Sequence, residues 1–187
     1  MTGVQTCALP ILVPLDEYAT VSDSATLYDA VLALEEAQEK FDNRPYKHRA
    51  VLVYDKKNRV VGKLSQLDII KALEPKYGEM GDIKSLSRFG LSRKFIASIL
   101  EQNYLWELPL TDICKKADTI KVKDFMYTPS EGEYVNETAS LEKACHQLVM
   151  GHHQSLLVTS GDKIIGILRL TDVFNAIFLA IKTTCSL

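Results

Sequence analysis

Two stretches of the sequence change from strand-like to helical spacing around a glycine, a polar residue and a carboxylate. In VVGKLSQLDIIKAL, residues 60–73, a hydroxyl and a carboxylate stand three residues apart as Ser65 and Asp68. A serine at a helix N-cap offers its hydroxyl beside free backbone N–H groups and the positive end of the helix dipole, which suits a phosphate. A carboxylate one turn later can accept two hydroxyl hydrogen bonds, such as those of a ribose diol. The pair therefore indicates a nucleotide site.

The same two residues also have an ordinary structural explanation. Ser65 alone fits a simple helix cap, and Asp68 fits an acid favoured in the first turn by the helix dipole. A second stretch, IIGILRLTDVFNAI at residues 164–177, has nearly the same plan. Because the chain uses the pattern twice, we favour the ligand site.

The second stretch departs from the first at its polar residue. It keeps Gly166 and Asp172 but has Arg169 where the first stretch has a serine. An arginine could bind a phosphate through two hydrogen bonds, or it could fill the cleft and abolish the site. Thr171 could bind a ligand or simply cap the helix. We therefore expect two unequal sites.

Basic residues precede the apolar strands AVLV and SLLV. His48 and Arg49 stand before the first and His153 before the second, where each could meet a phosphate or could simply be solvated. His152 and His153 have no recognised ligand spacing with a cysteine, so we expect no metal site.

An internal repeat must position these residues. ATLYDAVLALEEAQ (25–38) matches ASLEKACHQLVMG (139–151), and RAVLVYDKKNRVVGKL (49–64) matches QSLLVTSGDKIIGIL (154–168). Such a repeat is one supersecondary unit used twice, and two units commonly cover each other's apolar faces.

Within each copy the apolar spacing alternates between helical and strand-like. Helical spacing between residues 27 and 34 predicts an amphipathic helix with Ser24 or Thr26 as its N-cap. Two short apolar runs joined by DKKN in the first copy, and by SGDK in the second, predict hairpins. With a short leading strand and a second helix, each copy is predicted to be β-α-β-β-α.

The order of elements and the pattern G-h-x-[ST]-x-x-D from Gly62 to Asp68 resemble a CBS domain, the module named after cystathionine β-synthase. Two copies resemble a Bateman module. The lead-in FMYTP ending at Pro129 stands where ILVP ending at Pro14 does. The resemblance implies an α/β (α+β) fold in which two β-α-β-β-α repeats pack with pseudo-two-fold symmetry.

The resemblance also implies a function. It implies a regulatory module that binds an adenine nucleotide (AMP, ADP, ATP or a related adenosyl ligand) in the cleft between the repeats and signals through conformation or oligomerisation. Ser65 would cap the phosphate, and Asp68 and Asp172 would hold ribose hydroxyls. Disc-like homodimers are common in the family, and an unidentified protein partner is also possible.

Two other classes of function compete with this one. The principal alternative is a structural protein–protein interaction module without a small-molecule ligand. An enzyme is a weaker hypothesis, because the sequence has no GxSxG, HExxH, P-loop or GxGxxG motif. A required cofactor is not expected.

Composition excludes several partners. The chain has 187 residues, of which 47% are hydrophobic and 25% charged, with a net charge of −2 and a pI near 6.1. This charge balance gives no overall positive electrostatic potential that would attract nucleic acid. No apolar run approaches the roughly 20 residues of a membrane helix. Cys114, Cys145 and Cys185 lack CxxC or metal spacing, which favours reduced thiols. We expect a cytoplasmic protein.

The first residues do not fit the pattern of the rest. MTGVQTCALPI resembles the conceptual translation of a sequencing-library adapter, so we do not expect these residues to belong to the fold. A disordered tail is the alternative, and export is not expected. The expected organisation is an artefactual or disordered segment (1–12), a first repeat (13–74), a helical insertion (75–120), a second repeat (121–181) and a C-terminal tail (182–187).

The insertion is longer than a connector needs to be. Apolar residues recur with helical spacing in SRKFIASILEQNYLWEL, which predicts one or two helices. Such helices could pack on the flank of the module or form a dimer or partner surface around Phe95, Tyr104 and Trp106.

Overall fold

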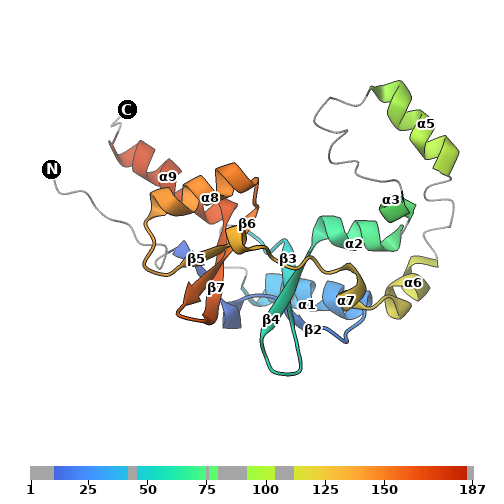
Figure 1. The fold of residues 1–187 in the computed structure, drawn as a ribbon, viewed down its shortest axis with the longest axis horizontal. Helices are drawn as coiled ribbons and strands as arrows, with labels where there is room; N and C mark the ends of the chain where they lie inside the picture. Colours follow the sequence, from blue (N-terminus) through green and yellow to red (C-terminus); the bar gives the residue numbers. More distant parts are fainter. Residues whose placement is uncertain (1–10, 42–45, 75, 80–91, 104–111, 185–187) are drawn as a thin grey trace.

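The computed structural model describes residues 11–41, 46–74, 76–79, 92–103 and 112–184. It contains two sheets, each formed mainly by one copy of the repeat, with helices packed around them (Figure 1). The predicted fold class, two β-α-β-β-α repeats with helices inserted between them, is confirmed.

The first repeat follows the predicted order. It consists of β2 (Thr20–Ser22), α1 (Leu27–Lys40), β3 (Ala50–Tyr54), β4 (Val60–Ser65) and α2 (Gln66–Leu73). Strand β3 lies in the centre of this sheet, parallel to β2 and antiparallel to β4.

The second repeat has the same order and the same pairing. It consists of β5 (Tyr134–Asn136), α8 (Leu141–Gly151), β6 (Ser155–Ser160), β7 (Lys163–Arg169) and α9 (Leu170–Thr184). Strand β6 is parallel to β5 and antiparallel to β7. The remaining elements are β1 (Val13–Pro14), η2 (Leu15–Glu17), α3 (Lys76–Glu79), α5 (Arg93–Asn103), α6 (Ile113–Thr119), α7 (Val122–Phe125) and η4 (Glu131–Glu133).

Side-chain caps explain where two of the helices of the first repeat begin. Of the two predicted caps, Ser24 and Thr26, it is Thr26 that caps α1. Its hydroxyl accepts a hydrogen bond from Asp29 N–H at 3.1 Å, and Asp29 Oδ2 accepts one from Thr26 N–H at 2.8 Å. Ser65 and Asp68 form the same capping box at α2. Such reciprocal bonds satisfy backbone donors that have no partner within the helix.

The leading segment of each repeat pairs with the sheet of the other repeat. Strand β1 lies antiparallel to β7, with Pro14 opposite Gly166. Tyr127, which precedes the second repeat, pairs with Lys63 on β4 through two backbone hydrogen bonds of 2.8 and 2.9 Å. The two copies are therefore held together by a reciprocal exchange of backbone pairing.

The glycine of the repeated pattern permits this exchange. A Cβ on Gly166 would lie 2.6 Å from the carbonyl oxygen of Val13, and one on Gly62 would lie 2.6 Å from Met126 Sδ. Contacts that close do not occur for real side chains, so a neighbour would have to move. The conflict at Gly166 involves backbone, whereas the conflict at Gly62 involves a flexible side chain.

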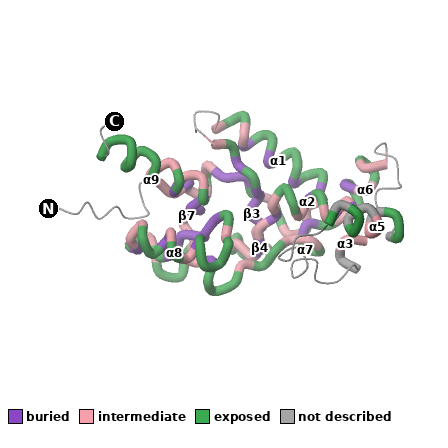
Figure 2. The backbone as a smooth tube through the Cα atoms, turned by 90° about the horizontal axis from the view of Figure 1, so that it is seen from above, coloured by how far each residue is buried: buried purple, intermediate pink, exposed green. Residues whose placement is uncertain are grey.

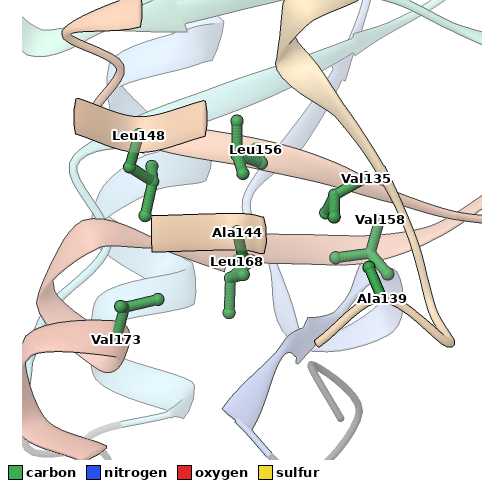
Figure 3. Packing of buried hydrophobic residues seen from close by; sticks show 8 residues of the cluster. All are labelled: Val135, Ala139, Ala144, Leu148, Leu156, Val158, Leu168 and Val173. Atoms are coloured by element: carbon green, nitrogen blue, oxygen red, sulfur yellow. The ribbon is translucent and has the colours of Figure 1, made fainter. Parts of the chain in front are cut away.

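Each repeat buries its own apolar core, and a third cluster joins them. Figure 3 shows the core of the second repeat, where residues of α8 pack over those of the sheet. The joining cluster includes Leu52 of β3 and Leu157 of β6, which stand at equivalent positions in the two copies. Strands β3 and β7 accordingly contain the buried stretches at the centre of the molecule in Figure 2. The sheets thus cover each other's inner faces, as the repeat predicted.

Parts of the predicted N-terminal segment and insertion can be placed. Ile11 and Leu12, at the end of the predicted segment 1–12, pack against the core of the second repeat. Helix α5 lies within the predicted insertion, with Phe95 exposed. Tyr104 and Trp106 lie outside the described residues.

We expect Gly166→Ala to lower the free energy of unfolding by about 1–3 kcal/mol, because the added Cβ meets backbone that can move only with β1. Gly132→Ala is the control, since the nearest atom to its added Cβ is His153 Nε2 at 3.8 Å. Urea unfolding of both variants measures the difference. Equal midpoints for the two variants would contradict the proposed crossing.

Candidate functional site: a cavity between the repeats

One cavity combines the N-terminus of α2 with the end of α8 and the start of β6. Its volume is about 460 Å³, within the usual range of small-molecule sites. We call it the Ser65 cavity. Its lining residues are Tyr18, Lys47, Arg49, Ala50, Lys63, Ser65, Gln66, Leu67, Asp68, Tyr127, Glu133, Gly151, His152, His153, Gln154, Ser155, Arg169, Leu170 and Thr171.

The capping box of α2 stands at the wall of this cavity. The Ser65 hydroxyl donates to Asp68 Oδ2 at 2.6 Å, and the Ser65 N–H donates to the same oxygen at 2.9 Å. The Asp68 N–H in turn donates to the Ser65 hydroxyl at 3.2 Å. Among the described residues, both hydrogen bonds to the Asp68 carboxylate converge on Oδ2, which leaves Oδ1 to accept from a ligand.

Basic residues border the same cavity. Lys47 and Arg49 are exposed and lie among the lining residues, together with His153. The Arg49 carbonyl accepts a hydrogen bond from the Gln66 N–H at 3.0 Å, which places the arginine next to the first turn of α2. Positive side chains near a helix N-terminus produce a local field suited to an anion, although the net charge of the chain is negative.

A polar network crosses from one repeat to the other in the cavity wall. Lys63 of β4 forms an ion pair with Glu133, whose side chain is 2% exposed. Tyr127 donates its phenol hydrogen to Glu133 Oε1 at 2.5 Å. This hydrogen bond to Glu133 raises the pKa of the Tyr127 phenol. Burial tends to raise the pKa of Glu133, but the hydrogen bonds from Lys63, Tyr127 and the Ser130 N–H together lower it.

The equivalent place in the second copy is arranged differently. Arg169 donates from Nε and Nη2 to the two carboxylate oxygens of Asp172, at 2.5 and 2.6 Å. Its Nη1 donates to the Tyr46 carbonyl at 2.9 Å and lies 3.4 Å from His48 Nδ1. The guanidinium is thus enclosed by groups from both repeats.

The structure divides the predicted site residues into two groups. The following line the Ser65 cavity: Arg49, Ser65, Asp68, His153, Arg169 and Thr171. His48 and Asp172 do not line it, and both contact Arg169 instead. The prediction also omitted Lys63, Tyr127 and Glu133. The alternation of β4 could have indicated Lys63, which stands two residues before Ser65 on the same face of the strand.

The part of the chain that the structure describes has neither a cluster of metal ligands nor a membrane-spanning helix. No group of three or more histidine, cysteine, aspartate or glutamate side chains there could hold a metal ion. No helix among those residues is long and apolar enough to cross a membrane.

Comparison with known proteins identifies the family. The CBS domain model matches residues 12–75 and 122–179, which is more than half of the chain. The chain belongs to the CBS domain family. Its two matches make it a tandem CBS pair, and the predicted family resemblance is confirmed. No curated protein matches the chain.

Solved CBS structures share the fold at low sequence identity. CBSX2 from Arabidopsis thaliana is 19% identical with a TM-score of 0.60, over 96% of this chain and 99% of that chain. A structure of CBSX2 in complex with AMP is 20% identical with a TM-score of 0.57, over 93% and 97%. A CBS domain-containing protein from Bacillus anthracis is 15% identical with a TM-score of 0.60, over 94% of each chain. These likenesses establish the fold of this CBS pair.

The buried Glu133 generates a prediction about pH. Its pKa in the folded state lies below its ordinary value of 4.5, so its ionised form stabilises the fold above that pH, and this contribution is lost as the pH falls through the folded-state pKa. We expect Glu133→Gln to cost up to about 3 kcal/mol at pH 7, because Lys63 loses its charged partner. The cost should shrink below about pH 4.5.

Urea unfolding of wild type and Glu133→Gln at pH 7 and pH 3.5 measures this change. Glu131→Gln is the matched control, because Glu131 is exposed in the same short helix η4. A cost for Glu133→Gln that stays constant across this range would contradict the assignment of the ion pair.

Proposed function

We propose that this CBS pair is a regulatory module that binds an adenine nucleotide, AMP, ADP or ATP, in the Ser65 cavity. The observation that carries the proposal is the position of the Asp68 carboxylate. It stands in the wall of a cavity of about 460 Å³, with one oxygen bound by the capping box and Lys47 and Arg49 at the rim. A carboxylate for hydroxyl groups and cations for an anion are the two needs of a nucleotide.

The residues divide the work according to their chemistry. Asp68 Oδ1 accepts hydrogen bonds from the ribose hydroxyls, because Oδ2 is already bound by Ser65. Arg49 and Lys47 neutralise the phosphate, and His153 approaches from the opposite repeat. The apolar side chain of Leu67, which is 59% exposed and lines the cavity, offers a surface for the adenine ring.

Signalling follows from the cavity's place between the repeats. The cavity is lined by both copies, and Lys63 and Glu133 join the copies in its wall. A ligand that contacts both copies stabilises one arrangement of them over others by its differential affinity. Binding is therefore transmitted as a change between repeats, with no catalytic step.

A relative supports the choice of ligand, since a CBSX2 structure of the same fold is a complex with AMP. Family members are typically regulatory, and we propose the same role here, in the cytoplasm.

We also propose that the module forms a homodimer. Helix α9 has an exposed apolar face whose members include Phe174 and Phe178, with ring centroids 6.5 Å apart in a stacked arrangement. Exposed apolar patches of this kind are typical of contact surfaces. This observation also favours the second candidate function, a protein interaction module without a ligand.

We expect Asp68→Asn to weaken AMP binding by roughly 10- to 100-fold, the equivalent of a lost hydrogen bond to a charged group. Isothermal titration calorimetry with AMP, ADP, ATP and GMP measures the affinity. Asp29→Asn is the matched control, because Asp29 forms the same capping box with Thr26 but is exposed and does not line the cavity.

Two results would contradict the proposed function. Binding of AMP with equal affinity by wild type and Asp68→Asn would move the ligand away from this cavity. If no nucleotide binds to the folded wild-type chain, the interaction module becomes the better account.

A further inference from the structure

Two backbone hydrogen bonds establish which residues of the two copies are equivalent. The Gln66 N–H donates to the Arg49 carbonyl at 3.0 Å, and the Leu170 N–H donates to the Gln154 carbonyl at 2.9 Å. Arg169 therefore occupies the position of Ser65, and Asp172, three residues later, occupies the position of Asp68. We call the surroundings of Arg169 and Asp172 the second position.

Hydrogen bonds hold the Arg169 side chain in this second position. Three of the five N–H groups of a guanidinium are engaged here by the Asp172 carboxylate and the Tyr46 carbonyl, and Nη1 also lies next to His48. The residue is 5% exposed. Both Asp172 oxygens accept from it, whereas Asp68 keeps one oxygen for other donors. A ribose could reach Asp172 only by displacing a buried ion pair.

Tyrosines of the first repeat stand beside the second position, where the Ser65 position has glycines of the second repeat. Counted from the paired strands, Tyr18 is equivalent to Gly132 and Tyr46 to Gly151. The buried His48 ring packs edge-on against Tyr18 at 4.5 Å between centroids. Its equivalent His153 lies beside the two glycines, at 3.8 Å from the place of a Cβ on Gly132. The Ser65 position is thus open where the second position is filled.

We propose that Arg169 closes the second position, so that each chain takes one adenine nucleotide, held through Asp68. This inference rests on the proposed function and deepens it, because it assigns the stoichiometry and the residue that sets it. Arg169, whose guanidinium excludes a ligand from Asp172, is also one of the residues that line the Ser65 cavity.

The test is the number of AMP molecules bound per chain, measured by equilibrium dialysis on wild type and on Arg169→Ser. This substitution recreates in the second copy the Ser-x-x-Asp spacing of the first, so the introduced hydroxyl can form a capping box with Asp172. Arg59→Ser is the matched control. Arg59 also donates Nε and Nη2 to a carboxylate, that of Asp55 at 2.8 and 2.6 Å, but it lies in the hairpin turn and lines neither position.

We expect one AMP per chain for wild type and Arg59→Ser, and two for Arg169→Ser. Two AMP molecules on wild type would overturn the inference while leaving the proposed function intact. One AMP on both wild type and Arg169→Ser would overturn the role of Arg169. No binding by either form would overturn the proposed function and this inference together. If Arg169→Ser fails to fold, the number of AMP molecules bound per wild-type chain still tests whether the second position is closed.

Discussion

The close crossing of each leading segment over a glycine of the other repeat is the constraint on which the rest of this structure depends. The Val13 carbonyl oxygen lies only 2.6 Å from where a Cβ of Gly166 would stand, and Met126 lies against Gly62. Because the two crossings are reciprocal, the sheet of each repeat has backbone pairing with a segment that leads into the other repeat. The joining cluster around Leu52 and Leu157 can then be excluded from water. The glycine of the repeated pattern is thus a requirement of assembly, while the polar residues after it are available for a ligand.

The same frame supports two different local arrangements. A strand ends, a helix begins and an aspartate stands one turn into that helix in both copies. A serine at the junction is short, so Ser65 bonds Asp68 and leaves an open cavity beside them. An arginine is long enough to cross to the other repeat, and Arg169 reaches the Tyr46 carbonyl. One side-chain length therefore determines whether the junction lines a cavity or fills the space. A tandem repeat can in this way retain its packing symmetry while its two positions differ in chemistry.

Much of the fold could be predicted from the sequence, because its signals are local. Periodicity and the Thr26 cap predicted the helices, and the turn DKKN predicted a hairpin. The site was harder to predict from the sequence. Ser65 and Asp68 bond within one helical turn, so their spacing indicated the pair. Glu133 meets Lys63 from a distant part of the chain, and no local spacing encodes that contact. Sequence reasoning likewise left open whether Arg169 binds phosphate or fills a cleft, because its partner Tyr46 belongs to the other repeat.

The central claim is that a nucleotide binds against Asp68 in the cavity between the repeats. A crystal structure of the wild-type chain grown with AMP tests this most directly. The account predicts one nucleotide in the Ser65 cavity, with its ribose hydroxyls within about 3 Å of Asp68 Oδ1 and the Arg169–Asp172 pair unbroken. AMP bound against Asp172, or a well-ordered Ser65 cavity containing only solvent at saturating AMP, would contradict it.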